Sequence, residues 1–77
     1  MIDVAFPELS QAEPDKEGIV ATWFVSEGET VAAGQLLAEV QMDKVSVEVY
    51  SPADGVVHLA AAEQVPLRQG QVIATIG

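Results

Sequence analysis

The strongest constraint on this chain is that it repeats itself. Residues Gly34–Ala38, with the letters GQLLA, recur 36 positions later as GQVIA in Gly70–Ala74. Upstream, Gly18–Val20 matches Gly55–Val57 at an offset of 37, which implies one residue deleted between the two blocks. Neither half is long enough to bury a core alone, so the repeat predicts two similar units that share one interior.

Short apolar runs separated by turn residues make up most of the sequence. No run of about 11 residues keeps the helical spacing of apolar side chains without a Gly or Pro interrupting it. The pattern indicates an all-β sandwich or barrel, with a polar surface loop over Glu8–Glu17. The expected strands are Ile2–Phe6, Ile19–Val25, Leu36–Met42, Val45–Tyr50, Val56–Leu59 and Val72–Ile76.

Composition limits both the size of the fold and its partners. The chain has 77 residues, 49% of them hydrophobic, and no cysteine, which fits one small domain over residues 1–77 stabilised by an apolar core. Twelve acidic residues against three basic ones give a net charge of −9. This balance argues against nucleic acid and anionic membranes as partners. The apolar runs are too short to span a bilayer, and the first residues lack the features of a secretion signal.

The segment that joins the two halves alternates like a hairpin. If Asp43 and Lys44 form a two-residue loop, one face of the hairpin carries only apolar side chains and the other pairs polar ones. A slip of one residue would bury two glutamates, so this register is well specified. The expected pairs are Met42 with Val45, Val40 with Val47, Ala38 with Val49, Gln41 with Ser46, and Glu39 with Glu48.

The tip of this hairpin is unusual because Lys44 stands where a tight turn favours glycine. Either the turn adopts type I geometry, or the lysine is present because its amine is needed. A charged tip that discourages aggregation of strand edges is the simpler explanation. However, Lys44 is one of only two lysines, and an amine at a rigid apex is a poor catalytic nucleophile but a good target for an acylating enzyme. Covalent attachment at Lys44 is therefore favoured over catalysis.

The order of these features resembles a known family. Asp43-Lys44 lies at the junction of two similar β halves and is followed by VSVEV in Val45–Val49 and SPADG in Ser51–Gly55. Gly18–Val31 and Gly70–Ile76 extend the likeness along essentially the whole chain. The sequence resembles the lipoyl domain, in the biotinyl/lipoyl attachment family, of the acyltransferase component of 2-oxo acid dehydrogenase complexes.

The resemblance implies a fold and a cofactor. The expected fold is a flattened β-barrel or sandwich of two four-stranded antiparallel sheets related by a pseudo-twofold axis, a barrel-sandwich hybrid. Lys44 would carry lipoate in amide linkage at one end, with both termini at the other. The hairpin residues Asp43, Met42 and Val45 would be read by the lipoate-attaching enzyme. The domain would be a non-catalytic carrier, a swinging arm that moves acyl groups and electrons between active sites.

The same resemblance implies partners and a location. The expected partners are a thiamine diphosphate-dependent 2-oxo acid decarboxylase, the acyltransferase core and a flavin-dependent dihydrolipoamide dehydrogenase. The isolated domain is expected to be a monomer, excised from a larger acyltransferase. Its location would be the cytoplasm of a bacterium or archaeon, or the mitochondrial matrix of a eukaryote.

The residues Gln41–Val45 depart from the Glu-Thr-Asp-Lys-Ala that lipoyl domains often have, but they follow the lipoyl form rather than the biotin form. Biotin carriers have Met directly on both sides of the lysine, whereas here Asp43 and Val45 flank it and Met42 lies two places before it. The carrier of biotin for a carboxylase, and an unmodified β-sandwich interaction module, remain alternatives. The usual glycine-acidic-glycine stretch after the first strand is replaced by Pro7–Glu13. Because that loop helps the decarboxylase choose its domain in the family, partner choice is uncertain.

Few other residues suggest chemistry. His58 is the single histidine and lies in a β run, so we expect a strand residue at least partly exposed rather than a catalytic base. Without cysteine, no metal site is predicted. Trp23 and Phe24 point to opposite faces of one strand, which leaves exposure of one of them at a contact surface as an alternative. We expect instead that one packs in the core and the other under the loop.

Overall fold

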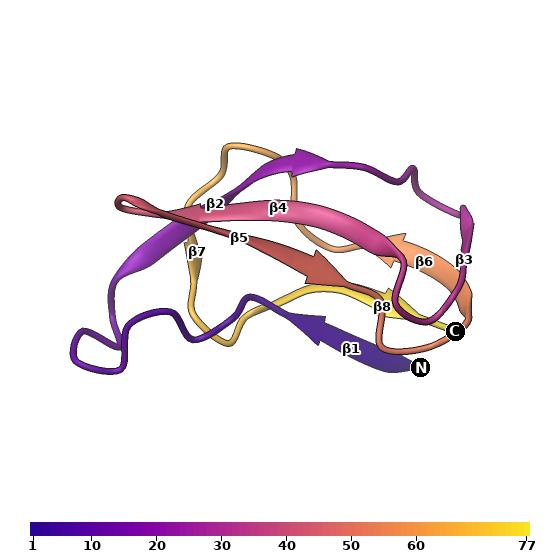
Figure 1. Cartoon of the computed structure of the whole chain (residues 1–77), viewed down its shortest axis with the longest axis horizontal. Coiled ribbons are helices and arrows are strands. Elements are labelled where there is room, and N and C mark those ends of the chain that lie inside the picture. The colour runs from indigo at the N-terminus through magenta and orange to yellow at the C-terminus, as the bar shows by residue number, and fades with distance from the viewer.

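The computed structural model describes all 77 residues as eight β-strands without a helix (Figure 1). Strands β4, β5 and β8 have the bounds that the sequence pattern predicts, and β2 begins and ends two residues earlier than expected. The strands are β1 (Ile2–Ala5), β2 (Glu17–Trp23), β3 (Thr30–Val31), β4 (Leu36–Met42), β5 (Val45–Tyr50), β6 (Gly55–Leu59), β7 (Leu67–Arg68) and β8 (Val72–Ile76).

The strands form two antiparallel four-stranded sheets, with the orders β1-β8-β6-β3 and β5-β4-β2-β7. The two orders become the same when β1 is matched with β5, β8 with β4, β6 with β2, and β3 with β7. The molecule is flattened and elongated, with extents of 34 × 19 × 18 Å. This arrangement confirms the all-β fold with pseudo-twofold symmetry.

The symmetry extends to individual hydrogen bonds. The N–H of Phe24 donates to the carbonyl of Leu37 at 2.8 Å, and the N–H of Ala60 donates to that of Ile73 at 2.8 Å. Both partners in the second bond lie 36 residues after those in the first. The repeat in the sequence therefore corresponds to a repeat of the backbone path.

Each sheet combines strands of both halves: β1 and β3 of the first half join β8 and β6 of the second, and β5 and β7 of the second join β4 and β2 of the first. The sequence pattern did not reveal two of these pairings, of β3 with β6 and of β7 with β2. Strands β3 and β7 have two residues each, too short to produce an alternating pattern, and this explains why only six strands were predicted. The consequence is that neither half can complete a sheet alone.

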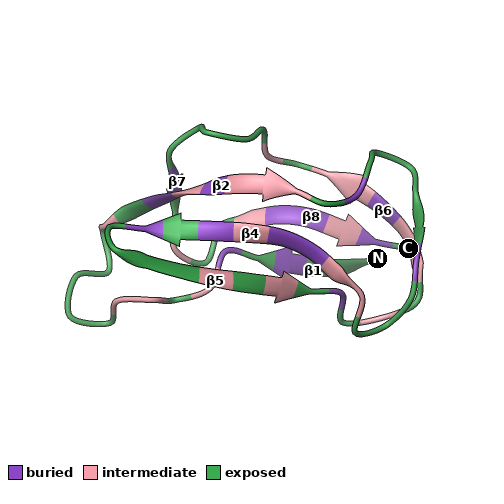
Figure 2. Cartoon of the chain, turned by 45° about the horizontal axis from the view of Figure 1, so that its top comes forward, coloured by how far each residue is buried: buried purple, intermediate pink, exposed green.

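The core lies between the two sheets and draws on both halves, with nine residues from the first half and five from the second. Figure 2 shows the buried residues along the middle of β4, β6 and β8, whereas the loops and the ends of the molecule are exposed. Fourteen buried apolar residues form one cluster. Its members are Val4, Phe6, Val20, Val25, Val31, Leu37, Ala38, Val40, Met42, Val57, Leu67, Ile73, Ala74 and Ile76.

Two equivalent glutamates fasten the ends of strands across the molecule. Glu27 accepts a hydrogen bond from the N–H of Leu59 at 2.6 Å, and Glu63 accepts one from the N–H of Trp23 at 2.7 Å. Glu27 also lies 3.0 Å from Nδ1 of His58. Because the N–H of Leu59 and, secondarily, His58 stabilise its carboxylate, the pKa of Glu27 is lowered from its ordinary value of 4.5.

The expectation for the two neighbouring aromatic residues was wrong. Neither Trp23 nor Phe24 belongs to the fully buried core. The indole of Trp23 is partly buried and donates from Nε1 to the carbonyl of Ala61 at 2.9 Å, whereas Phe24 is 52% exposed. Phe24 follows the last residue of β2, so the alternation of the strand no longer sets its environment. His58 lies in β6 and is half-exposed, as predicted for a strand residue.

The chain ends lie together at one end of the long axis, and the β4–β5 turn lies at the other (Figure 1). This placement agrees with the expectation drawn from the resemblance. The structure has no helix of the length and apolar character needed to cross a lipid bilayer.

One close approach explains the glycine at position 18, which has no left-handed backbone. Gly18 is buried, and a Cβ atom built on it would lie 2.5 Å from Cζ of Phe6 and 2.6 Å from the carbonyl oxygen of Gln41. The first contact is with a side chain that is fully buried and the second with the backbone of β4. Neither neighbour can move away easily, so β2 requires glycine at this position.

We predict that Gly18→Ala destabilises the fold by about 1–3 kcal/mol through overpacking. A glycine inside a strand normally costs stability, so alanine at an uncrowded position would raise it by about 0.5–1 kcal/mol. Urea denaturation of both proteins measures the difference. An unfolding free energy equal to or above that of the unsubstituted protein would contradict the packing described for Gly18.

We predict that Glu27→Gln lowers the melting temperature at pH 7, and that the difference from the unsubstituted protein shrinks below pH 4.5. The folded-state pKa of Glu27 is depressed, so its stabilising contribution is complete above 4.5 and is lost as pH falls through the lower folded-state value. Thermal unfolding between pH 7 and pH 3 tests this. Glu8→Gln removes the same charge from an exposed side chain without a hydrogen bond, and should show no such pattern.

Candidate functional site

The β4–β5 hairpin has the predicted register. The structure pairs Met42 with Val45, Val40 with Val47, Ala38 with Val49, Gln41 with Ser46 and Glu39 with Glu48. The β4 members of the apolar face are buried, but on β5 burial is incomplete and Val45 is 50% exposed. Strand β5 is at the edge of its sheet, which explains why its apolar side chains are less covered.

The turn itself differs from the sequence expectation. The residue with a left-handed backbone is Asp43, with φ of 56°, and Lys44 has a negative φ. The positive φ of Asp43 does not fit type I geometry, and the negative φ of Lys44 does not fit type I′, which needs positive φ at both central residues. Asp is one of the few non-glycine residues that adopt positive φ readily. Lysine therefore does not occupy a position that needs glycine, and the unusual residue at the tip is compatible with the backbone.

Lys44 is exposed at the apex of this hairpin. Its side chain makes no hydrogen bond and no ion pair within the chain. The apex projects beyond both sheets at the end of the molecule opposite the termini (Figure 1). Asp43 and Val45 on either side of it are also exposed, whereas Met42 is 3% exposed and belongs to the core. The structure thus presents the ammonium group of Lys44 to solvent from a well-packed base.

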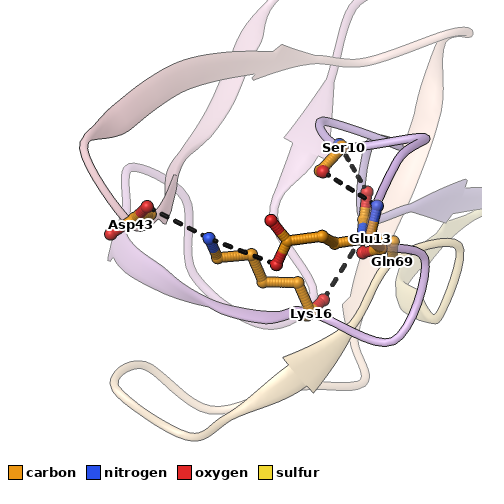
Figure 3. A network of polar contacts seen from close by, with 5 residues as sticks. All are labelled: Ser10, Glu13, Lys16, Asp43 and Gln69. Atoms are coloured by element: carbon orange, nitrogen blue, oxygen red, sulfur yellow. Dashed lines mark hydrogen bonds and ion pairs between the residues drawn. The ribbon is translucent and has the colours of Figure 1, made fainter.

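The loop between β1 and β2 is held by one side chain. The N–H of Ser10 donates to Oε1 of Gln69 at 2.7 Å. In return, Nε2 of Gln69 donates to the carbonyl of Glu13 at 2.9 Å and to that of Lys16 at 3.3 Å (Figure 3). Gln69 thereby fixes both ends of the segment from 10 to 16. Sequence reasoning missed this role, since nothing in the local pattern links Gln69 to a loop that lies so far away along the chain.

The same loop contacts the hairpin tip through Lys16. Its Nζ lies 3.1 Å from Oδ2 of Asp43 and 3.7 Å from Oε2 of Glu13, so the ammonium sits between two carboxylates (Figure 3). The hydrogen bond and negative charge of Asp43, followed by Glu13, raise the pKa of Lys16 above its ordinary value. The sequence analysis treated this stretch as a solvated loop, and only the fold brings Lys16 to Asp43.

Two shallow hollows flank the tip. One, of about 370 Å³, is lined by Glu17, Gly18, Ile19, Gln41, Asp43 and Pro66. The other, of about 200 Å³, is lined by Leu9, Ser10, Lys16, Met42, Asp43 and Val45. Asp43 lines both, so it stands between them on the surface beside Lys44. The end of the molecule that carries Lys44 is therefore shaped by the hairpin and by the β1–β2 loop together.

Comparison with known proteins identifies this arrangement. A protein-family profile described as "Biotin-requiring enzyme" matches residues 3–76, nearly the whole chain. The chain belongs to the biotin/lipoyl attachment family. The solution structure of the lipoyl domain of the 2-oxoglutarate dehydrogenase complex from Azotobacter vinelandii superposes with a TM-score of 0.80 at 29% identity, covering 100% of this chain and 96% of that one. The fold is that of a lipoyl domain.

Two curated relatives are similar in sequence. The chain is 41% identical, over all of its length, to the dihydrolipoyllysine-residue succinyltransferase component of the 2-oxoglutarate dehydrogenase complex of Staphylococcus saprophyticus. It is 40% identical, over 97% of its length, to the acetyltransferase component of the pyruvate dehydrogenase complex of Corynebacterium glutamicum. It spans only 18% and 11% of those proteins. The chain is thus a lipoyl carrier domain without catalytic activity of its own, in a family whose members carry lipoate covalently on a lysine.

We predict that Asp43→Gly leaves the domain more stable than Lys44→Gly, by about 1 kcal/mol. Glycine at 43 relieves the cost of a left-handed backbone, whereas glycine at 44 adds unfolded-state freedom with no gain in the folded state. Unfolding free energies from urea denaturation provide the comparison. The reverse order would contradict the placement of the left-handed backbone at Asp43.

Proposed function

We propose that Lys44 is the lipoate-bearing residue and that residues 1–77 act as one carrier domain of a bacterial 2-oxo acid dehydrogenase complex. The observation that carries the proposal is the state of the two lysines: Lys44 is exposed and unpaired at the hairpin apex, whereas Lys16 is engaged by two carboxylates. Relatives with about 40% identity are acyltransferase components of such complexes, which supports the assignment to this class of assembly.

The residues around Lys44 fit an amide-linked arm. The ammonium is open to an attaching enzyme, and the exposed Asp43 and Val45 give that enzyme a surface to read on each side. Met42 is buried, so we assign it the task of anchoring the tip to the core rather than direct contact. Amide formation removes one positive charge, which changes the net charge from −9 to −10.

The chain's contribution to the chemistry is positional. Lipoate supplies a ring disulfide that accepts an acyl group with two electrons and later releases both. The hairpin holds the point of attachment away from the sheets, and the termini, where a parent chain would continue, lie at the opposite end. A tether from that end leaves the tip free to visit several active sites, and turns each visit into an encounter at high effective concentration.

The partners we propose are a thiamine diphosphate-dependent decarboxylase, an acyltransferase core, a dihydrolipoamide dehydrogenase and a lipoate-attaching enzyme. The net charge of −9 supports transient docking on basic rims, which raises association rates more than affinity. The bacterial origin of the relatives supports a cytoplasmic location.

We predict that co-expression with a lipoate-attaching enzyme and free lipoate adds one lipoyl group to the domain, and that Lys44→Arg abolishes the addition. Arginine keeps the charge but offers no acylable amine. Intact-mass spectrometry reads the result directly. Lys16→Arg is the matched control, because it substitutes the second lysine, and it should be modified to the same extent as the unsubstituted domain.

Other outcomes discriminate the alternatives. A biotin adduct formed with a biotin-attaching enzyme at equal efficiency would favour the carboxylase carrier. An unmodified mass with both enzymes, in a protein that folds normally by circular dichroism, would favour an interaction module. Modification that persists in Lys44→Arg and disappears in Lys16→Arg would overturn the assignment of the attachment residue.

A further inference from the structure

The hairpin end of the molecule holds both lysines of the chain, although only one is available. Asp43 precedes Lys44 directly, so their Cα atoms are about 3.8 Å apart. Oδ2 of Asp43 lies 3.1 Å from Nζ of Lys16. The second amine is therefore held within a short distance of the residue proposed to carry the arm. The side chain of Lys16 is 32% exposed, so burial alone does not remove it from contact with reagents.

The amine of Lys16 is a competing acceptor for acyl groups carried at this end of the domain. An acyl thioester formed at this end of the domain can be lost by aminolysis: neutral Nζ attacks the carbonyl carbon, a C–N bond forms, and the C–S bond breaks. The thiolate leaves and takes up the proton that the nitrogen gives up, so the products are an acyl-lysine and a free thiol. The reaction needs no oxidant or further reactant, and it would mark Lys16 permanently while discharging the carrier.

We propose that Asp43, assisted by Glu13, shields Lys16 from acylation, so that acyl groups at this end of the domain are not lost to the second lysine. The proposal rests on the proposed function for its thioester, but the protection is a property of the folded chain alone. Asp43 would thus have a task beyond forming the turn and being read by the attaching enzyme: it occupies the amine that lies beside the arm.

Three observations support this task. Nζ of Lys16 contacts both carboxylates, at 3.1 Å and 3.7 Å, and their negative charge favours the protonated, non-nucleophilic amine. The hydrogen bonds from Gln69 to the carbonyls of Glu13 and Lys16 hold the loop so that these contacts persist. Lys44 makes no comparable contact. The same end of the molecule therefore contains one restrained amine and one free amine.

The test uses the unmodified domain and a small acetyl thioester, so it does not depend on lipoylation. The domain is incubated with S-acetyl-N-acetylcysteamine at pH 8, and acetylation at each lysine is followed by peptide mass mapping after cleavage at glutamate. Lys44 serves as an internal reference in the same molecule. We expect Lys16 to be acetylated more slowly than Lys44.

Asp43→Asn is the decisive variant, because asparagine also accepts a left-handed backbone and keeps the turn. It should raise acetylation at Lys16 by about two- to five-fold, the range expected for loss of one exposed ion pair, and so raise the ratio of Lys16 to Lys44 acetylation. Asp3→Asn removes the same charge from an exposed site near the termini and should leave the ratio unaltered.

Two results would overturn the proposal. One is equal acetylation of both lysines in the unsubstituted domain, and the other is a ratio that Asp43→Asn does not change. Neither bears on whether Lys44 receives lipoate, which the mass measurement on Lys44→Arg decides separately. The failure of this inference and the failure of the proposed function are therefore distinguishable.

Discussion

The structure depends on the exchange of strands between similar halves. Each half contributes two strands to the sheet of the other, so the core closes only when both are present. The sheets approach closely, and the buried Gly18 lets β2 lie against Phe6 and the backbone of β4. Because the packing is shared in this way, the long β4–β5 hairpin extends from a complete core, and its apex is positioned by the whole domain.

The pseudo-twofold symmetry is broken at the end of the molecule that carries Lys44. Residues 51–54 join β5 to β6, whereas the corresponding connection from β1 to β2 takes residues 6–16. The repeat also fails at Gln69, since the residue 36 positions earlier is Ala33. These departures belong together, because Gln69 holds the longer loop against the hairpin end. A position that differs between two otherwise matching halves does not have to serve the fold that they share, and here Gln69 orders the surface beside Lys44.

The sequence could predict the features that follow from the alternation of apolar and polar residues along a strand. It could not predict those that depend on single contacts between distant residues. The register of β4 with β5 followed from the cost of burying two glutamates, and every predicted pair is present. The strands β3 and β7 were missed because two residues are too few to show an alternation of apolar and polar side chains. The positive φ of Asp43 and the exposure of Phe24 depend on where a strand ends, to within one residue. Lys16 and Gln69 act through partners distant in sequence, so local patterns gave no indication that they hold the β1–β2 loop beside the hairpin tip.

The two lysines show how one end of a small domain can separate two identical functional groups. An exposed ion pair contributes little to stability, so the pairs that Lys16 makes are not needed to hold the fold. Their effect on reactivity can still matter, because acylation requires the neutral amine and a nearby carboxylate opposes its formation. A weak interaction that is negligible in folding can therefore decide which amine reacts. The acidic character of the chain thus has a local effect: carboxylates at this end restrain the amine of Lys16, whereas Lys44 forms no ion pair with them.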